Sequence, residues 1–394
     1  MTTAVQTLTS FAIAVASVLA PVSAVDLGVP AARVGMLVSI FFVAAIISGL
    51  LSAALVRRFG PIATLRGCIL LIGVALVAGA GGNVLLIIAY AVLAGISHGV
   101  VNPVSSLVLA QAVPASVRSL MFSIKQTGVP MGSAFAGVLL PPMLLVMSWQ
   151  HALWLLGAAS VLLLPVLRPF YALFDRHRQP RAPIVFAGAV EAFAEILRNR
   201  RILQLVGAAA MFAFVQLSVT TFIVSYLHLE LGYSLLAAGA VFSAMSVASV
   251  VGRIFWGWVA DRTAKPRRVL AGLGFLMGAC CIAGGFFSMA WPSWAVSVVA
   301  ILWGMSAVAW NGVFLAEIAR LAPVDKVAGM TSGAQAIFFS GSVLGAPLFG
   351  ALAGALGGFG PCYLLLAPLP ILCGALLLHS SFVATRALRA GSIR

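Results

Sequence analysis

The feature that most constrains this chain is a succession of about twelve long apolar runs, with nearly all of its charges confined to the connections between them. Each run is close to the ~20 residues that an α-helix needs to cross a bilayer. Only 8% of the 394 residues are charged and the mean hydropathy is +1.15, whereas soluble domains carry about 25% charged residues. A water-facing surface cannot be built from so few charges, so the sequence predicts an all-α, polytopic membrane protein with twelve transmembrane helices.

Charged residues and Gly- or Pro-containing turns separate the runs. The first run follows a segment without Lys or Arg, so it is interpreted as a span and not as a secretory signal. Gly81, Gly82 and Asn83 are interpreted as a tight turn between the third and fourth spans. The expected spans are 5–24, 33–55, 66–82, 84–110, 119–146, 150–170, 202–227, 235–260, 268–288, 293–319, 327–356 and 361–384.

The distribution of the 23 Lys and Arg residues predicts the orientation. If the N-terminus lies inside, almost all of them fall in cytoplasmic loops or in the C-terminal tail, as the positive-inside rule requires. Arg33 alone then lies outside, and Lys125 and Arg253 lie within spans. We therefore expect a multi-pass protein of the bacterial inner membrane with both termini in the cytoplasm.

The formal net charge of +15 would suggest a nucleic-acid partner in a soluble protein. Here it is explained by the topology and by attraction to anionic lipids of the inner leaflet, and no nucleic-acid motif accompanies it. The five cysteines lie in or beside apolar runs without metal-ligand spacing. We expect them to be packing residues, and we expect no metal and no cofactor.

The chain contains an internal repeat. At an offset of 204, Gly35, Ser39, Ala53 and Arg58 align with Gly239, Ser243, Gly257 and Arg262. At an offset of 209, Gly95, Asn102, Pro114, Met121, Gln126 and Gly132 align with Gly304, Asn311, Pro323, Met330, Gln335 and Gly341. The repeat predicts six-helix bundles at 1–167 and 202–394, joined by a basic cytoplasmic linker, 168–201, in which 184–197 has the spacing of an interfacial amphipathic helix.

One loop carries a family resemblance. The segment from Gly257 through Asp261 and Arg262, followed by two further arginines, resembles the G-x-x-x-D-R loop motif of the major facilitator superfamily. The copy after the second span is degraded, since Ala53 and Arg57 replace the glycine and the aspartate. The resemblance implies an alternating-access transporter, a monomer by default, and no enzymatic activity.

The same loop predicts a cytoplasmic latch in the second bundle. Asp261 lies where it can meet the positive N-terminal end of a neighbouring helix. Arg262 is expected to pair with Glu317, so Gly257, Asp261, Arg262 and Glu317 form the expected gating set. The alternative is that these are solvated loop charges.

Lys125 and Arg253 are the candidate substrate-binding cations. Lys125 follows Arg118 by seven residues and Arg253 precedes Asp261 by eight, which places both about 10–12 Å into the membrane. A cation at such depth costs at least ~2.5–3.5 kcal/mol and is a functional candidate by default. Together they predict an anion site; the alternative is that their side chains snorkel to the interface.

Other polar residues complete the expected site. Asn102, Asn311, Gln126 and Gln335 are matched by the repeat, and Gln216 lies in the seventh span. They either line the site or join helices by hydrogen bonds. His98 is the proton-coupling candidate, with a structural histidine as the alternative. Gly128, Gly132, Gly137, Gly341 and Gly345 are expected at close helix contacts.

The sequence therefore predicts a secondary active transporter of a small organic anion, a mono- or dicarboxylate, by anion exchange or proton-coupled symport. The logic resembles that of the oxalate/formate, monocarboxylate and cyanate-type branches of the superfamily. An inorganic-anion porter or a drug or metabolite exporter is the alternative within transport. A membrane enzyme and a non-transporting sensor are the alternatives outside it.

Overall fold

A computed structural model of the protein describes residues 1–112, 121, 124–176, 178–184, 195–263, 265–321 and 327–391. Every regular element in these residues is a helix, and eleven helical segments are long and apolar enough to cross a membrane. The remaining expected span, 119–146, begins among residues outside this set, and its described part includes α6 (Gly128–Met143). The all-α polytopic class is confirmed, whereas the amphipathic helix expected at 184–197 lies largely outside the described residues.

Contacts between Cα atoms divide the chain into two compact units. Unit 1 comprises Met1–Ala189, Thr220–Ser243 and Ala346–Ala351. Unit 2 comprises Val190–Val219, Ala244–Gly345 and Leu352–Arg394. Each unit is described separately below.

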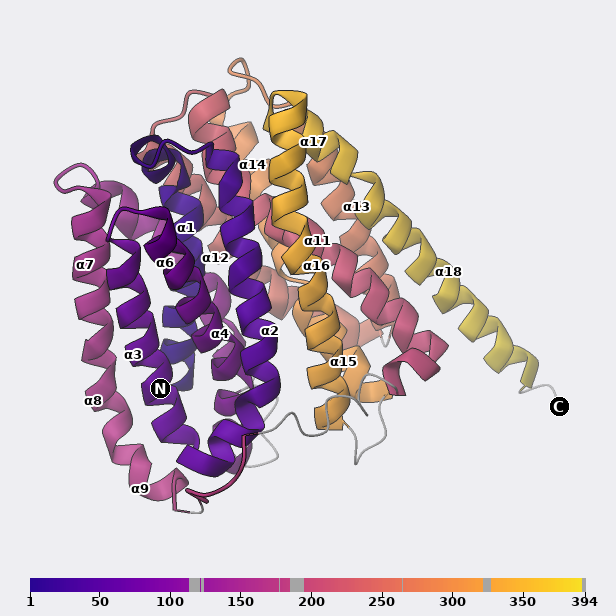
Figure 1. Ribbon diagram of the computed structural model, residues 1–394. Helices are drawn as coiled ribbons and strands as arrows, with labels where there is room; N and C mark the ends of the chain where they lie inside the picture. The colour runs from indigo at the N-terminus through magenta and orange to yellow at the C-terminus, as the bar shows by residue number, and fades with distance from the viewer. Residues whose placement is uncertain are drawn as a thin grey trace. The chain divides into compact units, whose positions relative to one another are not determined.

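The helices of unit 1 run in succession along the first part of the chain (Figure 1). They are α1 (Thr2–Asp26), η1 (Ala31–Arg33), α2 (Val34–Phe59), α3 (Pro61–Gly79), α4 (Val84–Ala112), α6, and α7 (Trp149–Ser160), which continues through η3 (Val161–Leu163), α8 (Leu164–Leu167) and η4 (Arg168–Phe170) to α9 (Tyr171–Phe174). A core cluster that includes Val5, Ile62 and Leu167 packs against Met1 and Phe174. The N-terminus and α9 therefore lie at the same end of this unit.

Glycines set the closest helix contacts of unit 1. A methyl group on Gly95 would overlap the Phe41 carbonyl oxygen, and one on Gly99 would overlap that of Ala45, so α2 and α4 cross with their backbones in contact. Gly132 of α6 meets the Thr7 carbonyl of α1 in the same way. Close packing through small residues is how membrane helices gain van der Waals contact.

A buried carboxylate holds the start of α3. Asp175, which follows α9, accepts hydrogen bonds from the backbone N–H groups of Ile62 and Ala63, both at 2.8 Å. Gly60 turns the chain into α3 with φ +90°, and a side chain there would collide with the Asp175 carboxylate. The expected turn at Gly81–Asn83 is also confirmed: Gly82 has φ +69° and Asn83 Oδ1 accepts from Leu86 N at 2.9 Å.

Unit 2 contains most of the second half of the chain. Its helices, three of which (α11, α12 and α16) also contribute residues to unit 1, are α11 (Arg200–Ser225), α12 (Leu235–Thr263), α13 (Pro266–Gly285), α14 (Ser293–Trp303), η6 (Gly304–Val308), α15 (Asn311–Leu321), α16 (Val327–Leu356), α17 (Phe359–Leu366) and α18 (Pro368–Gly391). The long α18 lies along α13 (Figure 1). Gly341 and Gly345 of α16 meet the carbonyl oxygens of Ala210 and Phe214 in α11, so the expected close contacts at these glycines are confirmed.

The turn η6 is a π-helix placed between α14 and α15. A π turn is wider than an α turn and changes which carbonyl groups find partners in their own helix. Two side chains of α12 donate to carbonyl oxygens here: Trp256 Nε1 to Met305 at 2.8 Å, and an Arg253 Nη atom to Val308 at 3.1 Å. The irregular turn thus anchors Arg253.

Candidate functional site: a buried lysine in unit 1 and a polar and aromatic cluster in unit 2

Lys125 is the most informative residue of unit 1. Its side chain is 1% exposed, and Nζ donates to Asn102 Oδ1 at 2.5 Å, to the Asn102 carbonyl at 2.9 Å and to Ser106 Oγ at 2.9 Å. Asn102 and Ser106 are one turn apart on α4, so a single helix face supplies all three oxygens. An ammonium group has three N–H donors, and each of them is satisfied here.

The ligands of Lys125 are neutral. Among the residues that the structure describes, no carboxylate oxygen lies within 4 Å of Nζ. Hydrogen bonds satisfy the donors of a buried ammonium but do not compensate its charge. The side chain therefore does not snorkel within unit 1, and it presents a positive charge that an anion can balance.

Asn102 has a second role in this arrangement. Its amide oxygen accepts from the ammonium group, which fixes the orientation of the amide and of its Nδ2 group. A carboxylate accepting from Nδ2 would lie within a few ångströms of the positive charge. The Lys125–Asn102–Ser106 group is thus chemically suited to an anion.

The other candidates in unit 1 lie on neighbouring turns. His98, one turn before Asn102 on α4, packs against Phe41 and Phe42 of α2, with ring centroids 5.3 and 6.1 Å apart. Gln126 is half-buried next to Lys125. These contacts do not test the proton-coupling role of His98, which stays a prediction.

In unit 2, the polar candidates Gln216 and Asn311 meet through one oxygen. Gln216 Oε1 accepts from Trp310 Nε1 at 3.0 Å and from Asn311 Nδ2 at 3.4 Å. Both amide side chains are half-buried, whereas Trp310 is fully buried. The bond to Trp310 fixes the orientation of the Gln216 amide.

Aromatic rings surround this polar pair. Trp310 packs edge-to-face on Phe212, Phe314 and Phe338, with centroids 5.4–5.8 Å apart. Phe339, whose ring centroid lies 4.9 Å from that of Phe338, is half-buried. Gln335, one turn before Phe339 on α16, is also half-buried. Unit 2 therefore combines amide groups with aromatic surface.

The predicted partner of Arg262 is wrong. Glu317, whose side chain is fully buried, binds Arg320 through two bonds of 2.7 and 2.9 Å and Arg267 at 3.4 Å. Arg262 instead lies 5.6 Å from the ring of Trp258, four residues earlier in the same helix. Arg267 is the better-placed partner of Glu317, because it lies in the first turn of α13, beside the Glu317 carboxylate.

Arg267 extends the charge cluster to two further helices. It donates to Ser380 Oγ of α18 at 3.2 Å and to the Arg201 carbonyl of α11 at 3.0 Å. Asp261 is exposed and forms no ion pair within the described residues. The cluster thus joins α11, α13, α15 and α18 within unit 2, and the gating role of Gly257, Asp261, Arg262 and Glu317 stays a prediction.

Sequence reasoning missed four residues at these positions. Ser106 follows Asn102 by four residues, a spacing that places both on one helix face, so it could have been found. Trp310 precedes Asn311 directly, but its bond to Gln216 joins residues 94 positions apart. Arg267 was counted among the cytoplasmic loop charges and Asp175 was not singled out, because sequence does not show which loop charges become buried.

The geometry alone defines a class of protein: a polytopic helical membrane protein with a buried cation held by neutral ligands. The sequence profile of the Major Facilitator Superfamily matches residues 2–323 of this chain. The chain belongs to the major facilitator superfamily.

Curated relatives are transporters. The chain is similar to a gallate transporter of Pseudomonas putida, 28% identical over 241 residues that are 54% of each chain. It is similar to monocarboxylate transporter 13 of Bos taurus, 25% identical over 90% of this chain and 80% of that one. It also resembles the 4-hydroxybenzoate transporter PcaK of Acinetobacter baylyi, 29% identical over 39% of this chain and 34% of that one. The matched segment spans about half the length of the gallate transporter.

Solved structures confirm the fold. A mutant peptide transporter POT in complex with sulfate superposes with a TM-score of 0.78 at 15% identity, over 98% of this chain and 94% of that one. A D-xylose–proton symporter gives 0.73 at 17% identity, over 95% of both chains. At such identities the likeness concerns the fold.

Proposed function

We propose that this protein transports a small organic anion bearing a carboxylate across the bacterial inner membrane by alternating access. The observation that carries the proposal is the buried Lys125 ammonium, which has three neutral oxygen ligands and no carboxylate within 4 Å among the described residues. The three relatives named above support it, since their names refer to gallate, to monocarboxylates and to 4-hydroxybenzoate.

Charge compensation supplies the energetic reason. Burying a lone cation in a span costs at least ~2.5–3.5 kcal/mol. A carboxylate 5 Å from Nζ, held by the Asn102 amide, would regain roughly 3 kcal/mol at an effective dielectric constant near 20. The anion therefore offsets most of the cost of burying the Lys125 ammonium group, whereas a cationic substrate would increase that cost.

The polar candidates of unit 2 are proposed as further substrate contacts. Gln216, Asn311 and Gln335 offer amide donors and acceptors, and Phe339 offers half-exposed aromatic surface beside them. Aromatic rings favour edge-to-face and offset partners. A carboxylate that carries an aromatic ring, such as 4-hydroxybenzoate, can bind both to amide groups and to aromatic rings. We therefore place aromatic monocarboxylates first among the candidate substrates.

Arg253 is proposed as a second cationic contact. Its guanidinium group is positioned by the bond that it donates to the Val308 carbonyl oxygen at 3.1 Å. Coupling is either exchange against a second anion or symport with a proton carried by His98 or by the substrate.

Ligand-induced stabilisation of the purified protein tests the proposal. A ligand at about 100 times its Kd stabilises the folded state by about 2.7 kcal/mol, which raises Tm measurably. We expect 4-hydroxybenzoate, gallate or another carboxylate to raise Tm in the wild type and not in Lys125→Gln. Arg57→Gln removes an exposed cation in the last turn of α2, and the ligand should raise its Tm as it does in the wild type. Stabilisation by cations or neutral compounds alone would favour the drug-exporter alternative.

A further inference from the structure

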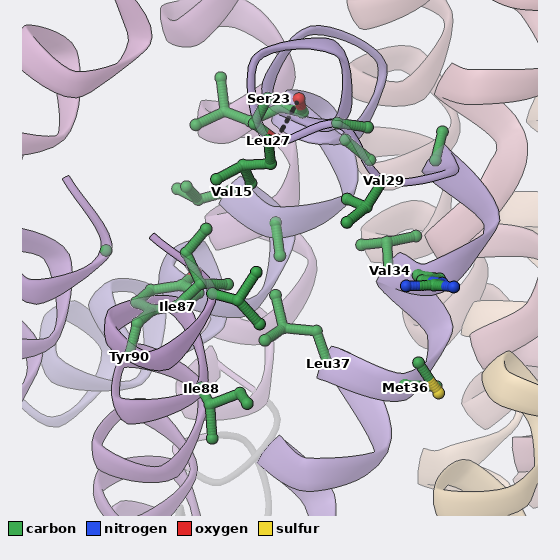
Figure 2. Close-up of a pocket in the computed structure, with 18 of the residues that line it drawn as sticks. Val15, Ser23, Leu27, Val29, Val34, Met36, Leu37, Ile87, Ile88 and Tyr90 are labelled. Atoms are coloured by element: carbon green, nitrogen blue, oxygen red, sulfur yellow. Dashed lines mark hydrogen bonds between the residues drawn. The ribbon is translucent and has the colours of Figure 1, made fainter. Parts of the chain in front are cut away.

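Unit 1 contains a cavity of about 240 Å3 that the transport proposal does not use. Its walls are formed by residues from 15–27 in α1 and just after it, from 29–40 in η1 and the first turns of α2, and from 84–90 in α4, and Gly79, Trp149 and Leu153 also line it. Almost all the side chains that line it are apolar, and Figure 2 shows those of Val15, Leu37 and Ile87 converging on it. A single ionised side chain, Arg33, lies among the lining residues.

The helix crossing explains why the cavity exists. The α2 and α4 backbones meet where Phe41 and Ala45 face Gly95 and Gly99. From this crossing the two helices continue toward their N-terminal ends, near Arg33 and Val84. The space that opens between these two ends and α1 is the cavity, which is called the wedge below. The wedge is open: Met36 is 52% and Val84 is 53% exposed. Exposed apolar side chains on membrane helices indicate contact with hydrocarbon.

The length of the wedge matches one leaflet. From Leu27 to Val15 the helix advances twelve residues, which is about 18 Å. Half of the hydrocarbon core is about 15 Å thick. An acyl chain whose head group lies at the level of Arg33 would therefore end near Val15 and Tyr90.

Arg33 supplies the charge for the head group. Its side chain is exposed, and within the described residues it forms no ion pair. The nearest acid along the chain, Asp26, is engaged with Trp149 Nε1 at 2.6 Å. A guanidinium group binds phosphate through paired N–H donors, so the mouth of the cavity has the chemistry of an anionic head-group site.

We propose that this wedge is a binding site for a phospholipid with an anionic head group, whose phosphate binds Arg33 and whose acyl chain fills the cavity between α1, α2 and α4. The site lies within unit 1 and is built from residues other than Lys125, Asn102 and Ser106. It is therefore independent of the substrate proposal.

Photo-crosslinking locates the lipid. The purified protein in detergent is mixed with phosphatidylglycerol that carries a diazirine near the end of one acyl chain, irradiated and digested, and the labelled peptides are identified by mass spectrometry. We expect labels in residues 15–27 and 84–90, and about tenfold less labelling by the matching phosphatidylcholine, because its choline cation leaves the head group without the net negative charge that Arg33 attracts.

Three variants separate head-group from acyl-chain binding. Arg33→Gln should reduce phosphatidylglycerol labelling about tenfold, to the level of phosphatidylcholine. Arg57→Gln, an equally exposed cation at the opposite end of α2, should leave it unchanged. Leu37→Trp, which fills the cavity, should reduce labelling by both lipids.

Any of three results would overturn the proposal. The label could fall outside these segments, the two lipids could label equally, or Arg33→Gln could behave like Arg57→Gln. Because Arg33 and Arg57 are both exposed, their comparison does not depend on a substitution in the core.

Discussion

At the scale of single residues, Lys125 and Asn102 provide a direct test of charge compensation. Asn102→Asp would place a carboxylate beside Nζ, where Asn102 Oδ1 now lies 2.5 Å away. We expect this variant to fold with unchanged or higher Tm and to lose at least about tenfold in anion affinity, because the lysine then has its own counter-ion. Equilibrium binding of a labelled carboxylate measures the effect, and Lys125→Arg, which keeps the charge, is the control. Unimpaired anion binding by Asn102→Asp would show that the lysine charge is not used.

Glu317 provides a second residue-scale prediction. Its buried carboxylate binds Arg267, whose side chain is 12% exposed, and Arg320, which is 65% exposed. Glu317→Gln leaves Arg267 without its counter-ion and should cost about 3 kcal/mol of folding free energy. Arg320→Gln should cost less than ~1 kcal/mol, because an exposed pair contributes little. Thermal unfolding in detergent compares the two, and equal losses would contradict the expected difference between the buried Arg267 pair and the exposed Arg320 pair.

At the scale of elements, the start of α3 depends on a carboxylate from a distant segment. Asp175 accepts two backbone N–H groups at the positive end of that helix. Asp175→Asn keeps one acceptor but removes the charge, so we expect a loss of about 1–2 kcal/mol. Hydrogen exchange should rise at Ile62 and Ala63 while the rest of α3 stays protected.

The matched control for this prediction is Asp26→Asn. Asp26 is exposed and accepts from an indole N–H, not from a helix N-terminus. We expect little change in hydrogen exchange at α3 in this variant. Similar exchange at Ile62 and Ala63 in both variants would contradict the capping role of Asp175.

The elements themselves were largely predictable. The period and length of the apolar runs fixed the number and approximate bounds of the spans, because backbone groups in hydrocarbon must be satisfied within helices. The π turn at Gly304–Val308 was not predictable, since its carbonyl groups are satisfied by Arg253 and Trp256 from another helix. Pairings of this kind depend on how helices pack, which a single sequence does not specify.

At the scale of the whole molecule, the repeat singled out polar residues as candidates but did not predict how their contacts differ between the units. Asn102 and Asn311 are repeat-matched, yet the first binds a lysine and the second binds Gln216. At the same offset, Lys125 aligns with Ala334, so the second half lacks an equivalent ammonium group at that position. The repeat therefore matches residues whose contacts differ between the two units.

The most direct test of the account is uptake of labelled 4-hydroxybenzoate into proteoliposomes that contain the wild type or Lys125→Gln. A transporter that recognises the carboxylate through this lysine should accumulate the label, and unlabelled carboxylates should compete while alkali cations should not. Lys125→Gln, reconstituted to the same density, should reduce uptake at least about tenfold, as expected when about 1.4 kcal/mol or more of binding energy is lost. Uptake of carboxylates that is unchanged in Lys125→Gln would contradict the central claim that the buried lysine forms the anion site.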